Sequence, residues 1–113
     1  MFECVLVPLD GSALAECVLP HVVAFARAFA SKCILVQVLE NPSSEDEAYP
    51  VDPLGWRIKK AQATSYLEAK AASLRDLNLA AETVVLEGTP AVRICEFARE
   101  RAIGLIIMST HGK

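Results

Sequence analysis

Residues 4–12 read CVLVPLDGS, an apolar run that breaks off into small polar residues. Residues 105–113, LIIMSTHGK, repeat that pattern near the other end of the chain. Each apolar run is too short for a helix and rich in branched residues, which is typical of a strand buried on both faces. Parallel sheets bind ligands outside the carboxyl ends of their strands. The sequence therefore predicts a ligand site where these two loops meet.

Strand and helix patterns alternate along the chain. We expect strands over residues 4–9, 33–39, 82–86 and 105–108, and helices over residues 13–30, 54–77 and from about residue 90. Strands that are apolar throughout predict a doubly wound parallel sheet with helices on both faces, an α/β fold. The last apolar run has the composition of a central strand. We therefore expect the single domain over residues 1–113 to be C-terminally incomplete, cut before a last helix and strand.

Three details of this pattern are testable against a structure. Pro20 conflicts with a helix over residues 13–30, because a proline at that depth removes a backbone bond or kinks the helix. The apolar stripe Ile58, Leu67 and Leu74 predicts core packing by the second helix. The acidic, proline-rich segment 40–53 predicts a loop, either a solvated connector or a lid near the ligand site.

Composition narrows the class of protein. The 113 residues suffice for one core, and 53% are hydrophobic, mostly alanine and branched aliphatics. No apolar run reaches the roughly 18 residues that a membrane span needs, and the first residues lack the basic segment of a signal peptide. A net charge of −3 without a basic cluster argues against nucleic-acid binding. The four scattered cysteines fit buried thiols in a reducing compartment. We expect a cytoplasmic protein.

Asp10 is the first candidate ligand residue, because it directly follows a buried strand. An acidic residue there can accept hydrogen bonds from the hydroxyls of a sugar. Capping of the next helix by Asp10 stays open, although Ser12 is also placed for that role. Residues 108–113 offer backbone N–H groups, hydroxyls and a lysine for an anion such as phosphate. A general base at His111 has little support, because the sequence offers it no partnered nucleophile.

These segments, with the pattern between them, resemble the universal stress protein family. The matching residues follow the family in order over the whole chain: 5–12 (VLVPLDGS), 34–38 (ILVQV), 88–91 (GTPA) and 105–113 (LIIMSTHGK). The combination is specific, although each piece alone is not. The resemblance implies a small α/β domain with a five-stranded parallel sheet that forms homodimers, and many members bind ATP.

The resemblance also implies where the nucleoside would lie. Pro8 and Asp10 match positions that line the adenosine, with Asp10 toward the ribose, and Leu9 lies between them in the predicted site. Val38 matches the strand position whose backbone reads the adenine edge.

The phosphate part of the implied site is shorter than the family pattern. Met108, Ser109 and Gly112 match the start of the phosphate loop, and Ser109 stands where that loop has its first glycine. A later glycine with its serine or threonine would lie beyond Lys113, so we expect these residues alone to form half of the nucleotide site. The implied cofactor of the full-length protein is ATP, with Mg²⁺ as a companion ion.

Three rival functions require other residues. Large side chains that fill the pocket would favour a ligand-free dimerising module of the same fold. The residues at the predicted site, Pro8, Asp10 and Val38, are not of that kind. A phosphate-accepting receiver domain needs an aspartate after the third strand, where the chain has Glu87. A nucleotidyl transferase or pyrophosphatase needs an H-x-G-H or S-G-G-x-D-S motif and a paired acid and base, which the sequence lacks. We therefore expect a binding protein rather than an enzyme, with slow ATP hydrolysis left open.

Overall fold

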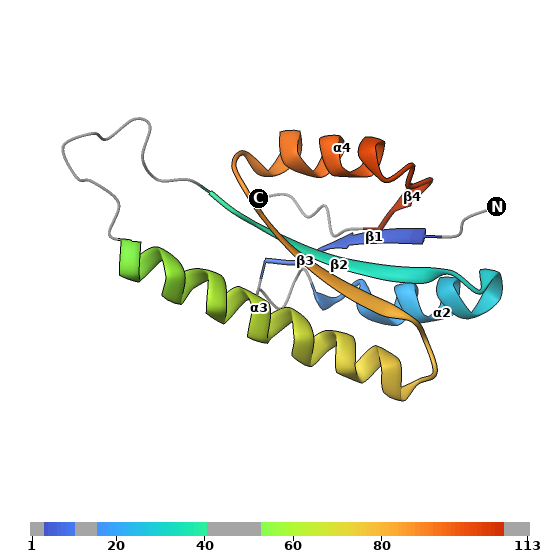
Figure 1. Cartoon of the computed structure of the whole chain (residues 1–113). Coiled ribbons are helices and arrows are strands. Elements are labelled where there is room, and N and C mark those ends of the chain that lie inside the picture. The colour runs from blue at the N-terminus through green and yellow to red at the C-terminus, as the bar shows by residue number, and fades with distance from the viewer. Residues whose placement is uncertain (1–3, 11–15, 41–52, 108–113) are drawn as a thin grey trace.

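The structure, a computed structural model, describes residues 4–10, 16–40 and 53–107. Four strands of these residues form one parallel sheet in the order β3-β2-β1-β4: β1 (Cys4–Pro8), β2 (Lys32–Leu39), β3 (Ala81–Glu87) and β4 (Leu105–Ile106). Helices α2 (Leu19–Phe29) and α3 (Pro53–Asp76) lie on one face of the sheet, and α4 (Pro90–Glu100) lies on the other (Figure 1). The predicted doubly wound α/β fold is confirmed.

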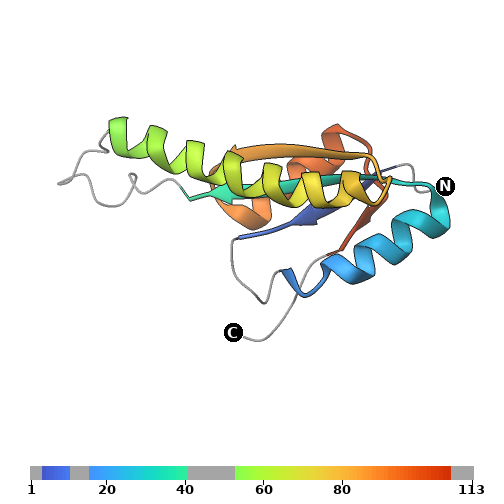
Figure 2. The same cartoon turned by 90° about the horizontal axis from the view of Figure 1, so that it is seen from below.

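The strand order reverses at β1. From β1 the chain moves outward to β2 and β3 and then returns to place β4 on the other side of β1. Val5 accordingly pairs in parallel with Cys33 of β2 and with Leu105 of β4. The predicted neighbourhood of the first and last strands is thus confirmed. Figure 2 shows the two layers of helices from a second direction, with α3 lying lengthwise along the sheet.

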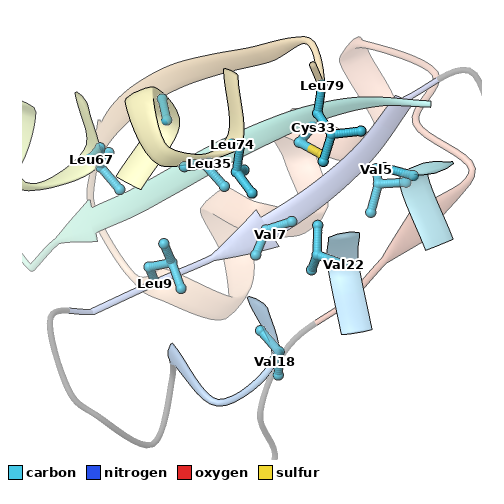
Figure 3. Close-up of a cluster of buried hydrophobic side chains, with 12 residues drawn as sticks. Val5, Val7, Leu9, Val18, Val22, Cys33, Leu35, Leu67, Leu74 and Leu79 are labelled. Carbon is cyan, nitrogen blue, oxygen red and sulfur yellow. The ribbon is translucent and has the colours of Figure 1, made fainter. Parts of the chain in front are cut away.

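The main core lies between the sheet and the pair α2 and α3. Alternate residues of β1 and β2 point to this face and meet apolar residues of the two helices (Figure 3). Its fully or almost fully buried members include Val5, Val7, Leu9, Cys33 and Leu35 of the sheet side, with Val22, Leu67 and Leu74 of the helices. The residues between them, such as Leu6 and Ile34, form a smaller core with Phe97 of α4. Both faces of the central strands are therefore buried, as the continuous apolar runs predicted.

The prediction of one continuous helix over residues 13–30 is wrong, because a turn interrupts it. Cys17 and Val18 form a turn, and α2 begins only at Leu19, with Pro20 in its first turn. Proline is tolerated there because the first N–H groups of a helix have no partner within it. The conflict at Pro20 is resolved by a later helix start. Residues 11–15 lie outside the described part of the chain.

The predicted core stripe of α3 is wrong at Ile58. Leu67 and Leu74 are buried against the sheet, whereas Ile58 is 49% exposed. Ile58 and Leu67 are about two and a half helical turns apart, so they face opposite ways. The first turns of α3 also extend past the tip of β2 (Figure 1).

Two smaller predictions, on the cysteines and on the segment 40–53, agree with the structure only in part. The cysteines are all free, but only Cys33 is buried, with a thiol pKa raised by burial, while Cys17 and Cys95 are exposed. Of the predicted loop over residues 40–53, Pro53 belongs to α3 and residues 41–52 lie outside the described part. No helix among the described residues is long and apolar enough to cross a membrane.

Candidate functional site

Pro8 interrupts the hydrogen bonding of β1 toward β4. The Ile107 N–H donates to the Leu6 carbonyl oxygen across 3.0 Å, which continues the pairing of β4 with β1. Every second residue of a strand turns its N–H to the same neighbour, so residue 8 would supply the next donor toward β4. Proline has no N–H, and β4 ends at Ile106. The ladder therefore lacks a hydrogen bond from residue 8, close to where the strand order reverses, and open α/β sheets bind ligands at such points.

β2 continues past the end of β1, so the backbone groups of its last residues have no β1 strand beside them. Pro8 is the last residue of β1 and lies opposite Val36, and the Leu9 N–H donates to the Val36 carbonyl across 2.8 Å. On the other side, the Gly88 N–H donates to the Leu39 carbonyl across 3.0 Å. Backbone groups alternate in direction along a strand, so Val38 turns its N–H and C=O to the β1 side. β1 has left the sheet at that level, and this edge can face a ligand.

The predicted residues at the end of β1 differ in what they expose. Pro8 is half-buried, and Asp10 is exposed just past the strand. Leu9 is 3% exposed and belongs to the main core. Its side chain thus anchors the chain, and its backbone hydrogen bond to Val36 fixes the point from which Asp10 leaves the sheet.

The predicted phosphate segment cannot be placed beside these residues. Met108, Ser109 and Gly112 lie outside the described part of the chain, as do Gly11 and Ser12. The described residues of β4 end at this same carboxyl edge of the sheet, because β1 and β4 run parallel.

A contact among three residues holds the chain at Glu16, just after the undescribed residues 11–15. The Tyr66 hydroxyl of α3 donates to Glu16 Oε2 across 2.6 Å, and Lys70 Nζ lies 3.2 Å from Glu16 Oε1. The Tyr66 hydrogen bond, together with Lys70, lowers the pKa of the Glu16 carboxyl from its ordinary value. Residues 11–15 are therefore bracketed by Leu9, held on β2, and Glu16, held on α3. The sequence carries no signal for this contact, since its partners are far apart in the chain.

The side chain of Arg93 packs over the turn between β3 and α4. Gly88 has φ +132°, and a Cβ there would meet Arg93 Cγ at 2.9 Å. Arg93 Nε donates to the Glu87 carbonyl across 3.2 Å, so its side chain lies over the glycine. Only glycine fits both the backbone conformation and the space. The sequence Gly88-Thr89-Pro90 is thus a structural turn that starts α4.

The carboxylate of Glu87 ties the same end of β3 to α3. Lys60 Nζ lies 2.5 Å from Glu87 Oε2. Hydrogen bonds from Lys60 and, to a smaller degree, from Trp56 hold the pKa of Glu87 below its ordinary value. This contact anchors the first half of α3, while the Glu16 contact anchors its middle.

Comparison with known proteins identifies the family to which the chain belongs. The sequence pattern of the universal stress protein family matches residues 1–113. The chain belongs to the universal stress protein family. Universal stress protein Sll1654 of Synechocystis is 32% identical over 114 residues, which cover 99% of this chain and 69% of that relative. The resemblance inferred from the sequence is confirmed.

Solved structures of universal stress proteins share the fold. A family member from Burkholderia pseudomallei superposes with a TM-score of 0.82 at 24% identity, covering 97% of this chain and 83% of the other. A universal stress protein in complex with cAMP gives a TM-score of 0.70 at 20% identity, covering 94% of this chain and 75% of the other. At these identities the likeness establishes the fold alone.

Proposed function

We propose that this family member binds an adenine nucleotide, with ATP as the first candidate, at the carboxyl edge between β1 and β4. The observation that carries the proposal is the direction of the Val38 backbone, which turns one donor and one acceptor past the end of β1. The Watson–Crick edge of adenine presents an amino donor beside a ring-nitrogen acceptor. A backbone N–H and C=O on one residue match that pair.

Asp10 supplies the ribose contact in this proposal. It is exposed at the same edge, two residues after the proline that ends β1. A carboxylate accepts hydrogen bonds from both hydroxyls of a ribose, as acidic residues do in dinucleotide-binding folds. The base at Val38 and the sugar at Asp10 would place the phosphates toward β4.

The phosphates would meet Met108, Ser109 and Gly112, whose backbone N–H groups suit an anion. Among residues 4–10, 16–40 and 53–107, no three His, Cys, Asp or Glu side chains gather as a metal site. Mg²⁺ would accordingly come with the phosphates rather than with a protein cage, as Mg²⁺ usually does. The universal stress protein that binds cAMP lends support, because cAMP shares its adenosine with ATP.

The biological role that we propose is nucleotide-dependent signalling in a stress response by the full-length protein, as a cytoplasmic homodimer. In this proposal the site holds a ligand and does not transform it. Binding of the nucleotide would change which partners the protein meets.

The deciding experiment is to denature the purified full-length protein and identify any released nucleotide by mass. We expect an adenine nucleotide, and a rise in melting temperature when Mg-ATP is added to the stripped protein. Release of nothing, together with no stabilisation by Mg-ATP, would favour the ligand-free dimerising module. Size-exclusion chromatography with light scattering tests the homodimer separately.

A further inference from the structure

β3 lies at the border of the sheet, and no strand of the described residues pairs with its outer side. All seven of its residues are half-buried or exposed, whereas the interior of β1 is fully buried. A strand edge presents unpaired N–H and C=O groups, so it can pair with a strand of another molecule. Proteins therefore protect long edges with charged side chains or by covering them. The outer edge of β3 is long enough to need such protection.

Alternation along β3 decides which of its backbone groups face outward. The Cys33 N–H of β2 donates to the Ala80 carbonyl across 2.9 Å. At the other end, the Gly88 N–H donates to the Leu39 carbonyl across 3.0 Å. Even-numbered residues of this stretch thus turn toward β2. Since backbone groups alternate in direction along a strand, the odd-numbered residues turn theirs outward: Ala81, Thr83, Val85 and Glu87.

Arg75 of α3 covers the first of these outward carbonyls. Its Nε and Nη2 donate to the Ala81 carbonyl oxygen across 3.2 and 2.8 Å. Its Nη1 donates to Glu68 Oε1 across 3.2 Å. Glu68 in turn accepts a 2.7 Å hydrogen bond from the Thr83 hydroxyl at its other oxygen. The guanidinium is therefore held at the strand edge by a carbonyl of β3 and by a carboxylate that β3 orients.

Arg93 of α4 covers the last outward carbonyl. Its Nε donates to the Glu87 carbonyl across 3.2 Å, and its Nη1 lies 2.5 Å from Glu96 Oε1. The side chain crosses Gly88, where a Cβ would lie only 2.9 Å from Arg93 Cγ. Because α3 and α4 lie on opposite faces of the sheet (Figure 1), an arginine from each face caps one end of the same edge.

A second copy of β3 fits the backbone pattern of this edge. In an antiparallel pair of β3 strands centred on Val84, Thr83 lies opposite Val85 of the other copy, and Ala81 lies opposite Glu87. All four residues turn their backbone groups outward, so both are hydrogen-bonded pairs. The arrangement is isologous, as interfaces between two identical chains usually are.

The side chains of that arrangement are compatible as well. Glu82 lies opposite Leu86 and Glu87 lies opposite Ala81, so no two like charges face each other directly. Glu82 is also paired within its own chain, with Lys32 Nζ 2.8 Å from its Oε1. What opposes the pairing is therefore the two arginines and not the sequence of the strand.

We propose that the outer edge of β3 is a surface for pairing with a second copy of this chain, and that Arg75 and Arg93 block it. Each outer pair of the antiparallel arrangement uses two capped carbonyls, that of Ala81 from one copy and that of Glu87 from the other. A second copy must displace the guanidiniums before the edge can pair along its length. The uncapped residues 83–85 form a stretch shorter than most strands.

The test removes both arginines from the full-length protein. Arg75→Met combined with Arg93→Met keeps most of the side-chain length and removes the donors that cap the carbonyls. Sedimentation velocity at several concentrations should show assemblies larger than those of wild type. The association constant should be at least about ten times higher, the effect of two hydrogen bonds that a partner strand no longer has to displace. The amides of Thr83 and Val85 should become protected from hydrogen exchange in the larger assembly.

Two further variants show where the association occurs. Arg57→Met combined with Arg99→Met is the matched control, because it removes the same charge from exposed positions of the same two helices. It should associate like wild type. Val85→Pro, added to the variant without Arg75 and Arg93, removes an outward N–H and breaks no bond to β2, which edge strands tolerate. It should return the association to the wild-type level.

Each outcome decides for or against the proposal. Unchanged association without Arg75 and Arg93 overturns it, and so does an equal rise in the control variant, which would assign the effect to lost charge. Association through partial unfolding would increase with Val85→Pro, because proline strains the strand, and that result also overturns pairing at β3. Arg75→Met and Arg93→Met made singly should each give a smaller rise, which keeps the test valid if the double variant unfolds.

Discussion

The hydroxyl of Tyr66 donates a 2.6 Å hydrogen bond to the carboxylate of Glu16, although the two residues are 50 positions apart. The bond joins the middle of α3 to the chain that returns from the carboxyl edge of the sheet. Directly before Asp10, Leu9 is fixed by its hydrogen bond to Val36. The segment that starts with Asp10 is therefore fixed at both ends. At one end the contact comes from Tyr66 of α3.

Replacing Tyr66 by phenylalanine should raise the pKa of Glu16 toward its ordinary value of 4.5, because the largest cause of its lowering is removed. The lowered pKa stabilises the folded protein above about pH 4.5, and this contribution disappears as the pH falls through the folded-state pKa. The variant should thus lose less stability than wild type on acidification below that value. NMR titration and melting curves at several pH values test both points.

The same Tyr66→Phe variant should weaken nucleotide binding a few-fold at pH 7, because the chain that follows Asp10 loses one of its two anchors. Glu68→Gln is a suitable control, since Glu68 bonds Thr83 and Arg75 on another side of α3. An equal loss of affinity in Glu68→Gln would mean that α3 acts through general stability and that Glu16 has no special part.

Asp10→Asn should reduce ATP affinity about 10- to 100-fold, the range of a hydrogen bond to a charged group. It should also remove most of the preference for ATP over 2′-deoxy-ATP, because the carboxylate is proposed to accept from the ribose hydroxyls. Competition binding with the two nucleotides measures the preference. A variant that keeps this preference would show that Asp10 serves the following helix and not the sugar.

Gly88→Ala should destabilise the protein by about 1–3 kcal/mol, because a side chain at φ +132° is strained and its Cβ would press on Arg93. Arg93→Ala would remove the contact and leave the backbone strain, so the double variant should recover only part of the loss. Denaturant unfolding measures both. Full recovery in the double variant would mean that the φ angle costs nothing.

Leu67→Ala should cost about 2–5 kcal/mol of unfolding free energy, because its side chain is fully buried. Ile58→Ala lies on the same helix but is 49% exposed, and should change stability by no more than about 0.5 kcal/mol. Unfolding in urea compares the pair. Equal losses would contradict the burial that separates the two positions.

The residues that were read correctly from the sequence are those whose pattern is local. Apolar runs located the strands, because a buried strand is recognised from neighbours in the chain. The candidate site at Pro8 and Asp10 was inferred from the end of the first run and stays a prediction. Ile58 failed because helical spacing shows which residues share a face but not where the sheet beneath the helix ends. The Tyr66–Glu16 contact joins residues 50 positions apart, which no local pattern encodes.

Pro8→Val tests whether proline opens the sheet at the site. Valine restores the N–H that proline lacks, so the ladder between β1 and β4 can continue by one bond past the Leu6–Ile107 hydrogen bond. We expect the new amide at residue 8 to be protected from hydrogen exchange and ATP affinity to fall, because the strands now pair where the ligand should enter. Val7→Ile on the same strand is the control, as it faces the main core and leaves the ladder unchanged. A rapidly exchanging amide at residue 8 would mean that β1 and β4 diverge for another reason, and that proline there only follows the separation.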